Sequence, residues 1–237
     1  MLKIILNRLK PQAEKIIAEE QEGLRAGRST TEIFNLRILC EKYLQHQRDL
    51  YHVFTDFKKA FDRVWHAALW ATMKKYNIST NLIHVIKNLC NKATSAVFFN
   101  SSIGDWFRTT AGIRQGCLLS PTLFNIFLEK KIMTDTLEDH EGTVSIGGRT
   151  ITNLRFADDI DGLAGEEEEL ADLVERLDKA STAYGMVCLF VSWCFEPSQP
   201  QRITSGLLRH GDQCRDQADD KQHNWHQHRG QSEWTEA

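Results

Sequence analysis

Two adjacent carboxylates, Asp158 and Asp159, follow a short apolar run at residues 151–156 whose apolar side chains alternate at strand period. Residues 160–164 have the composition of a return strand, so the sequence predicts a hairpin with two acids at its tip. Carboxylates fixed on a rigid turn suit a divalent ion, because Mg²⁺ prefers hard oxygen ligands. Aspartate is also common in turns, where it bonds its own backbone, so a purely structural turn is the alternative.

Composition places the chain among ordinary globular proteins. Its 237 residues are 41% hydrophobic and 26% charged, enough for one large core or two small ones. The net charge of −3 gives no overall basic signature, so a nucleic-acid partner would have to meet a local patch. Six cysteines without CxxC spacing indicate free thiols in a reducing compartment. Neither a membrane span nor a signal peptide is predicted, and we expect an intracellular protein of the nucleus or cytoplasm.

Hydrophobic periodicity predicts a chain of alternating helices and strands. The expected helices are 1–22 with an interruption at Pro11, 29–47, one from Lys58 onward, 78–94, one from Ser120 onward, and 166–184. The expected strands are 51–57, 96–100 paired with 106–110, and 144–148 paired with 149–156. Asp56 then lies at a strand-to-helix junction, where functional side chains often gather.

Two loops have compositions suited to binding. Arg25 and Arg28 precede the helix expected from residue 29, and a helix N-terminus with arginines can hold a phosphate. A surface turn with two solvated arginines is the alternative that their spacing favours. The second loop has glycines on both sides of Arg114-Gln115, which would let the backbone approach a flat ligand closely.

Four blocks stand in one order along the chain: GLRAGRSTTE, VFTDFKKAFD, GIRQGCLLSPTLFNIF and LRFADDIDGLAG. Together they resemble the reverse transcriptase domain of non-LTR (LINE-type) retrotransposons, over residues 1–186. The resemblance implies an α+β fold: a right-hand polymerase palm with partial fingers, a small antiparallel sheet packed on helices, and no thumb. Residues 1–50 would be partial fingers, and residues 51–186 mainly palm.

The resemblance also implies a reaction, RNA-directed DNA synthesis from deoxynucleoside triphosphates on an RNA template and a DNA primer. Two Mg²⁺ (or Mn²⁺) ions about 4 Å apart would activate the primer hydroxyl and stabilise the leaving pyrophosphate. The catalytic carboxylates would be Asp56, Asp158 and Asp159, which requires the fold to bring two distant strands side by side. Phe57 would offer its backbone carbonyl to a metal.

Nucleotide contacts follow from the same resemblance. Phe61 matches the ring that blocks a ribose 2′-hydroxyl, although a core aromatic of a helix is a competing interpretation. Gln115 and Gly116 match the loop that packs on the incoming nucleotide. Arg25 and Arg28 lie in a fingers-side block that would face the triphosphate.

Residues 187–237 depart from the family pattern. They show no helical or strand period, and the family's strand and its lysine-bearing segment are not recognisable there. We expect a non-homologous, disordered tail that arose by frameshift or read-through. A metal site made of Cys214, His223, His226 and His228 is disfavoured, because their spacing lacks a second ligand pair.

Three functions remain open on the sequence. The first is an RNA-directed DNA polymerase domain. The second is a catalytically inactive retroelement fragment with at most weak nucleic-acid binding. The third is an unrelated metal-binding or structural protein in which the Asp-Asp turn is only a turn. Oligomeric state and template specificity are not indicated.

Overall fold

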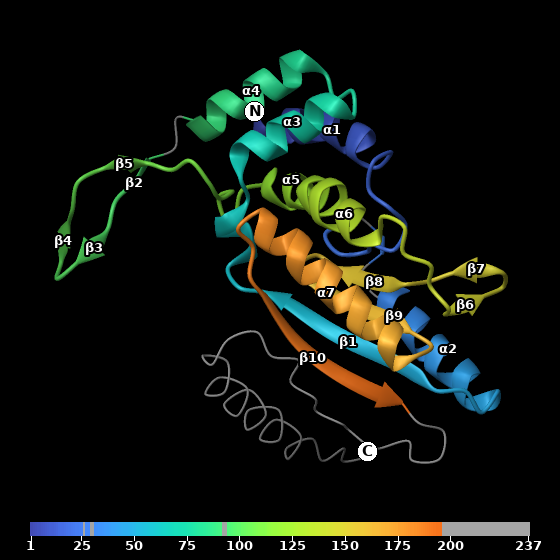
Figure 1. Ribbon diagram of the computed structural model, residues 1–237. Helices are drawn as coiled ribbons and strands as arrows, with labels where there is room; N and C mark the ends of the chain where they lie inside the picture. The colour runs from blue at the N-terminus through green and yellow to red at the C-terminus, as the bar shows by residue number, and fades with distance from the viewer. Residues whose placement is uncertain (26, 29–30, 92–93, 196–237) are drawn as a thin grey trace, which may run out of the picture.

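The fold is built around a four-stranded antiparallel sheet with strand order β10-β1-β9-β8. In this computed structural model we describe residues 1–195 except 26, 29–30 and 92–93. The strands are β1 (Leu50–Phe57), β8 (Asn153–Phe156), β9 (Asp159–Ala164) and β10 (Cys188–Phe195). The central strand, β1, pairs with β9 on one side and β10 on the other (Figure 1). The predicted α+β palm with a small antiparallel sheet is confirmed.

One face of the sheet is covered by α7 (Glu167–Ala183), which contacts β1 and β9. A π-helical turn η2 (Leu128–Met133) and α6 (Thr134–Leu137) pack against α7, and α5 (Ser120–Phe127) leads into η2. Ala164 and Val53 lie in a core cluster with Leu170 and Val174 of α7, so apolar burial holds this helix across the strands (Figure 1).

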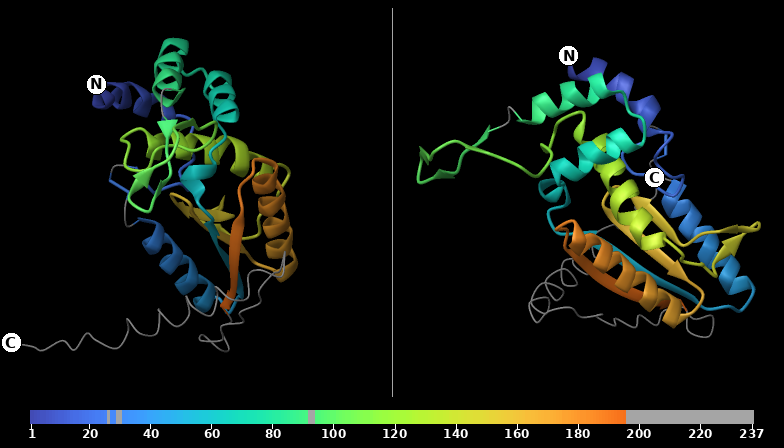
Figure 2. Two further views of the ribbon diagram at one scale, coloured as in Figure 1. Left: turned by 90° about the vertical axis from the view of Figure 1, so that its left-hand side faces the viewer. Right: turned by 45° about the horizontal axis from the view of Figure 1, so that its top comes forward.

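The opposite face packs on α2 (Thr31–Gln45) at the β8–β9 side. Leu39 and Tyr43 of the helix form a cluster with Leu154 and Leu163. Because side chains alternate along a strand, Leu163 points away from the face that carries Ala164. The two views of Figure 2 show α2 on the other side of the sheet from α7.

Three more helices complete the far end of the core: α1 (Leu2–Ala13), α3 (His66–Lys75) and α4 (Thr80–Asn91). The expected interruption at Pro11 is wrong, because α1 passes through this proline and ends at Ala13 instead of resuming. The continuous helix expected from Lys58 is also wrong. A 3₁₀ turn, η1 (Ala60–Arg63), is followed by extended backbone at Val64 and Trp65, where Trp65 pairs with Ala111. The pairing of Trp65 with Ala111 therefore determines the local backbone conformation in place of the helix propensity of this segment.

Two hairpins project from the body. One is an arm of β2 (Thr94–Ser95), β3 (Phe98–Phe99), β4 (Ser102–Ile103) and β5 (Phe107–Arg108) (Figure 1). The expected pairing of 96–100 with 106–110 is wrong in detail, because β3 pairs with β4 in the expected loop and β5 pairs with β2. The other joins β6 (Ser145–Ile146) to β7 (Arg149–Thr150). The single strand expected over 149–156 is wrong, since β7 and β8 are separate strands.

The expectation that no strand follows Met186 is wrong for residues 188–195. These residues form β10, which is in register with all eight residues of β1, from Phe57 opposite Cys188 to Leu50 opposite Phe195. Aromatic and β-branched residues favour a strand here, and β1 offers an unpaired edge. Residues 196–237, including Cys214, His223, His226 and His228, lie outside the described residues.

Among the described residues, no helix is both long enough and apolar enough to cross a bilayer.

Candidate active site

The acidic residues come from two neighbouring strands and the turn between β8 and β9. Thr55 of β1 lies opposite Ile160 of β9. Continuing this antiparallel register by one residue brings Asp56 level with Asp159, the first residue of β9. Asp158 occupies the two-residue turn just before it, because Phe156 pairs with Asp159. The fold therefore places the two distant strands side by side and brings the three predicted acids to one end of the sheet.

Electrostatics links two of these acids directly. Asp158 is half-buried, and burial is the main cause that raises its pKa above the usual range of an aspartate. The negative charge of Asp56 raises the pKa of Asp158 further, while a backbone hydrogen bond lowers it. Two carboxylates that repel across adjacent strands would be relieved by a cation placed between them.

The donor set fits a metal that takes part of its ligands from substrate. Within the described part of the chain, no group of three or more His, Cys, Asp or Glu side chains converges as a metal cage. Mg²⁺ is usually bound by one or two carboxylates together with substrate phosphates and water, so Asp56 and Asp158 satisfy the protein's share. Asp159 is exposed and Phe57 is buried, its backbone in the pairing of β1 with β10.

Phe61 lies on η1, the 3₁₀ turn that follows the Asp56 end of β1. Its half-buried ring stacks on Phe124 of α5, with centroids 4.9 Å apart and planes at 16°. Its carbonyl accepts a hydrogen bond from the Ile113 N–H at 2.8 Å, which ties η1 to the following loop. The Phe61 side chain thus packs against the core, as the competing interpretation holds, and remains partly exposed.

The loop from Gly112 to Ser120 exposes Gln115 and Gly116. Gly116 has φ +78°, a left-handed conformation that favours glycine. The Ser120 hydroxyl donates to the Arg114 carbonyl at 2.7 Å and so closes the loop onto the first turn of α5. Ser120 is the first residue of α5, as the sequence predicted for the start of this helix.

Arg25 and Arg28 line a cleft of about 310 Å³ between α1 and α5, together with Lys10 and Asn125. Arg25 has a structural role: its guanidinium donates to the carbonyls of Ala18 and Gln21 at 2.8 Å, and its Nε donates to Glu14 at 3.1 Å. The predicted triphosphate contact at these arginines stays a prediction.

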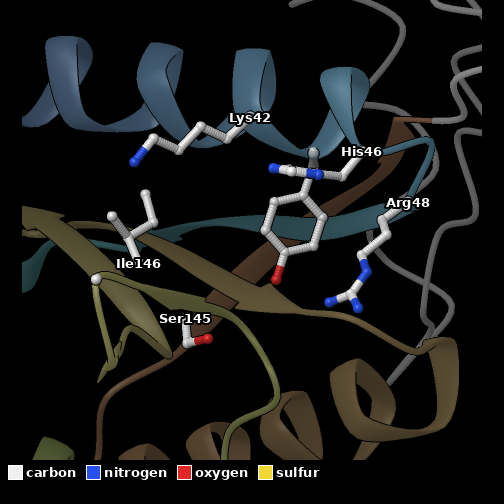
Figure 3. Close-up of a pocket in the computed structure, with 7 residues that line it drawn as sticks. Lys42, His46, Arg48, Ser145 and Ile146 are labelled. Carbon is white, nitrogen blue, oxygen red and sulfur yellow. The ribbon is translucent and has the colours of Figure 1, made fainter.

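A second cleft, of about 450 Å³, has a basic lining. Lys42 of α2 and the nearby His46 and Arg48 face Ser145 and Ile146 of the β6 hairpin, and Tyr43 and Gly147 complete the wall (Figure 3). None of the described residues that line it is acidic. The cleft lies near the Leu50 end of β1, whereas the acids lie near its Phe57 end.

The sequence did not single out a buried histidine–aspartate pair. His52 Nδ1 of β1 lies 3.5 Å from Asp161 Oδ1 of β9, and both side chains are at most 10% exposed. Burial raises the pKa of Asp161, and His52 opposes that rise. The alternation of Asp159 and Asp161 along β9 was the available signal, because it places both on one face.

The chain is similar to known proteins both in sequence and in fold. The family model described as reverse transcriptase (RNA-dependent DNA polymerase) matches residues 1–188. The chain is 29% identical over 151 residues to the probable RNA-directed DNA polymerase from transposon X-element of Drosophila melanogaster, covering 63% of the chain and 15% of the relative. It is 27% identical over 184 residues to the RNA-directed DNA polymerase from mobile element jockey of the same species, covering 75% of the chain and 19% of the relative. The chain thus spans less than a fifth of the length of these relatives.

Solved structures with a similar fold include telomerases. Apo telomerase from Candida tropicalis, truncated from its C-terminal domain, aligns with a TM-score of 0.60 at 16% identity, covering 81% of this chain and 40% of that one. Telomerase from Candida albicans, solved with a fragment of telomeric RNA, aligns with a TM-score of 0.58 at 13% identity, covering 80% of this chain and 33% of that one. At these identities the likeness concerns the fold.

Proposed function

The chain belongs to the reverse transcriptase (RNA-dependent DNA polymerase) family, and we propose that its acidic strand ends catalyse RNA-directed DNA synthesis from deoxynucleoside triphosphates. The observation that carries the proposal is the strand register that brings Asp56 to the same end of the sheet as Asp158 and Asp159. Burial is the main cause that raises the pKa of Asp158, and the charge of Asp56 raises it further. A structural turn would gain nothing from a second carboxylate that disfavours ionisation of Asp158, whereas a site for a divalent ion needs carboxylates close together.

The residues that would hold the metal are Asp56, Asp158 and Asp159, with the Phe57 carbonyl. Enzymes of this family generally use divalent ions; two Mg²⁺ ions, when bound, would supply charge neutralisation at the transferring phosphate. The chain's own contribution is positioning. The β1–β9 ladder sets the separation of the carboxylates, and the Gly112–Ser120 loop exposes Gln115 and Gly116 for the incoming nucleotide.

Phe61 would act on the choice of sugar. The stack on Phe124 holds its ring in one orientation, so the exposed part of the side chain could obstruct a ribose 2′-hydroxyl without moving. Arg25 and Arg28 would reach the triphosphate from the cleft between α1 and α5 that they line.

The RNA template and DNA primer would need positive charge that the chain as a whole lacks. The second cleft, lined by Lys42, His46 and Arg48, supplies this positive charge, and none of its described lining residues is acidic. Contacts there would be made to phosphates and would carry no sequence information.

A second candidate is a catalytically inactive domain that binds nucleic acid weakly. It is favoured by one observation: Asp56, Asp158 and Asp159 do not converge as a three-ligand cage among the described residues. The two candidates differ in whether the acids do chemistry.

Primer extension separates them. The assay uses the purified chain, poly(rA)·oligo(dT), dTTP and Mg²⁺ or Mn²⁺. We expect extension by the wild type and none by Asp158→Asn. The matched control is Asp105→Asn, an exposed aspartate on the arm, which should extend like the wild type. Equal binding of the duplex by wild type and Asp158→Asn, with no extension by either, would support the inactive candidate.

A further inference from the structure

We propose that Gln21 is a positioning residue that clamps the turn carrying Asp158. The inference rests on the proposed function, because it assigns Asp158 to the active site. Gln21 is only 1% exposed and lies in the segment between α1 and α2, far from the turn in sequence. No sequence motif singled it out.

The segment around Gln21 adds a short parallel bridge to the outer edge of β8. Gln21 is bridged with Arg155, the Glu22 N–H donates to the Arg155 carbonyl at 2.8 Å, and the Arg155 N–H donates to the Glu20 carbonyl at 2.9 Å. The backbone of this segment is therefore fixed beside the strand that enters the turn.

The Gln21 side chain then bonds both backbone groups of Ala157, the residue before Asp158. Its Oε1 accepts the Ala157 N–H at 2.9 Å, and its Nε2 donates to the Ala157 carbonyl at 2.9 Å. Ala157 has φ +60°, a left-handed conformation that a residue with a Cβ adopts only at a cost. An amide that pairs with both sides of this one residue offsets that cost and fixes the direction in which the chain enters Asp158.

The clamp is anchored from behind by Gly23. Oε1 of Gln21 also accepts the Gly23 N–H at 3.0 Å, and Asn125 of α5 donates to the Gly23 carbonyl at 3.0 Å. A Cβ at Gly23 would lie 1.9 Å from the Ala157 nitrogen, so only glycine permits this approach. The turn is thereby linked through Gln21 and Gly23 to the helix that follows the nucleotide loop.

The functional consequence is a fixed geometry between Asp158 and Asp56. Asp56 is held by β1, which is paired on both sides, whereas Asp158 sits in a turn whose conformation is intrinsically unfavourable. Misplacement of a catalytic group by about 1 Å can reduce the rate on the order of 100-fold. Gln21 contacts neither substrate nor metal and acts only through this turn.

The test uses variants of the full chain. Gln21→Met keeps the length and removes every hydrogen bond of the amide, whereas Gln21→Glu keeps the acceptor and loses the donor. The matched control is Gln12→Met, because Gln12 also makes two backbone bonds, donating to the Arg8 carbonyl and accepting the Ser79 N–H, on a different surface.

The first readout is hydrogen exchange at the Ala157 amide, measured by NMR, and it does not depend on activity. We expect Gln21→Met to accelerate this exchange about tenfold, as expected for the loss of a buried hydrogen bond, while the β1 and β9 amides are unchanged. Gln12→Met should leave Ala157 protected. Unchanged exchange at Ala157, or equal acceleration throughout the sheet, would overturn the clamp.

The second readout is Mn²⁺ affinity by electron paramagnetic resonance, followed by kcat and KM for dTTP. We expect Gln21→Met to weaken Mn²⁺ binding and to lower kcat about 10- to 100-fold with KM nearly unchanged, and Gln21→Glu to recover part of kcat. Normal Mn²⁺ affinity and kcat in a variant with an unprotected Ala157 would overturn the positioning role. A wild type that protects Ala157 but does not extend primers would overturn the proposed function and leave the clamp standing.

Gly23→Ala provides an independent variant. Its Cβ would drive the segment off the turn, so it should accelerate Ala157 exchange even with Gln21 intact. Retained protection in Gly23→Ala would contradict the anchoring.

Discussion

A buried ion pair lies immediately before the turn that carries Asp158. The Arg155 guanidinium donates to Glu129 Oε2 at 3.0 Å, and the two side chains are 1% and 9% exposed. The same oxygen accepts the Ala18 N–H at 3.1 Å. Glu129 lies on the π-helical turn η2, so three distant segments meet at one carboxylate.

Glu129→Leu removes this carboxylate and leaves the Arg155 charge buried without a partner. Removing one member of a buried pair costs about 3–5 kcal/mol. For a chain of this size each kcal/mol lowers the melting temperature by about 2–4 °C, so we expect a fall of about 10 °C. Urea unfolding monitored by circular dichroism should give the corresponding loss in the free energy of unfolding.

The matched control is Glu41→Leu, which breaks the exposed Arg37–Glu41 pair and should leave the free energy of unfolding unchanged within error. The double variant Glu129→Leu/Arg155→Met should recover most of the loss, because apolar side chains of similar size can replace a buried pair. A single variant as stable as the control, or a double variant less stable than the single one, would refute the reasoning.

Two further predictions concern β10 and the basic cleft. Burial raises the pKa of Cys188 to about 12. Since the thiolate is the nucleophile, iodoacetamide at pH 8 should label Cys188 in urea but not in the folded chain. Labelling of the folded chain should accelerate as the pH rises toward 12. Equal labelling in both states would show that β10 is not formed. The double variant Lys42→Ala/Arg48→Ala should bind an RNA–DNA duplex more weakly at low salt, as measured by fluorescence anisotropy. The slope of log affinity against log salt should fall by about 1–2, because each lost phosphate contact removes about 0.9 from the slope. An unchanged slope would exclude the cleft as a backbone contact, and Lys87→Ala, an exposed lysine on α4, serves as control.

The sequence predicted the elements whose signals are local. Alternating apolar residues located β1 and the hairpin of β8 and β9, and the helical period located α7. These features depend on periodicity, which a single sequence displays. The prediction that Asp56 meets the Asp158 turn came instead from the family resemblance, because a strand end alone does not indicate which segment lies beside it.

Features set by distant contacts could not be predicted in this way. The break at Val64 and Trp65 depends on the pairing of Trp65 with Ala111, and β10 depends on the open edge of β1. Gln21 and Glu129 are polar residues without a periodic signal. Gln21 bonds Ala157, which lies more than a hundred residues away in the sequence, and Glu129 pairs with the buried Arg155. Sequence patterns report which residues are apolar, not which buried polar groups satisfy one another.

The two acids are held by different means, and this difference explains where the supporting residues lie. Asp56 is held by strand pairing, since Asp56 itself pairs with Leu189 of β10 and the preceding Thr55 pairs with Ile160 of β9. Asp158 follows a residue at φ +60° on the outer hairpin, where the ladder alone cannot dictate the turn. The polar groups buried behind the turn therefore come from outside the sheet: the amide of Gln21, which bonds Ala157, and the carboxylate of Glu129, which pairs with Arg155. A domain that kept both aspartates but lost this support would keep the acidic motif and lose the separation between the carboxylates on which a metal site depends.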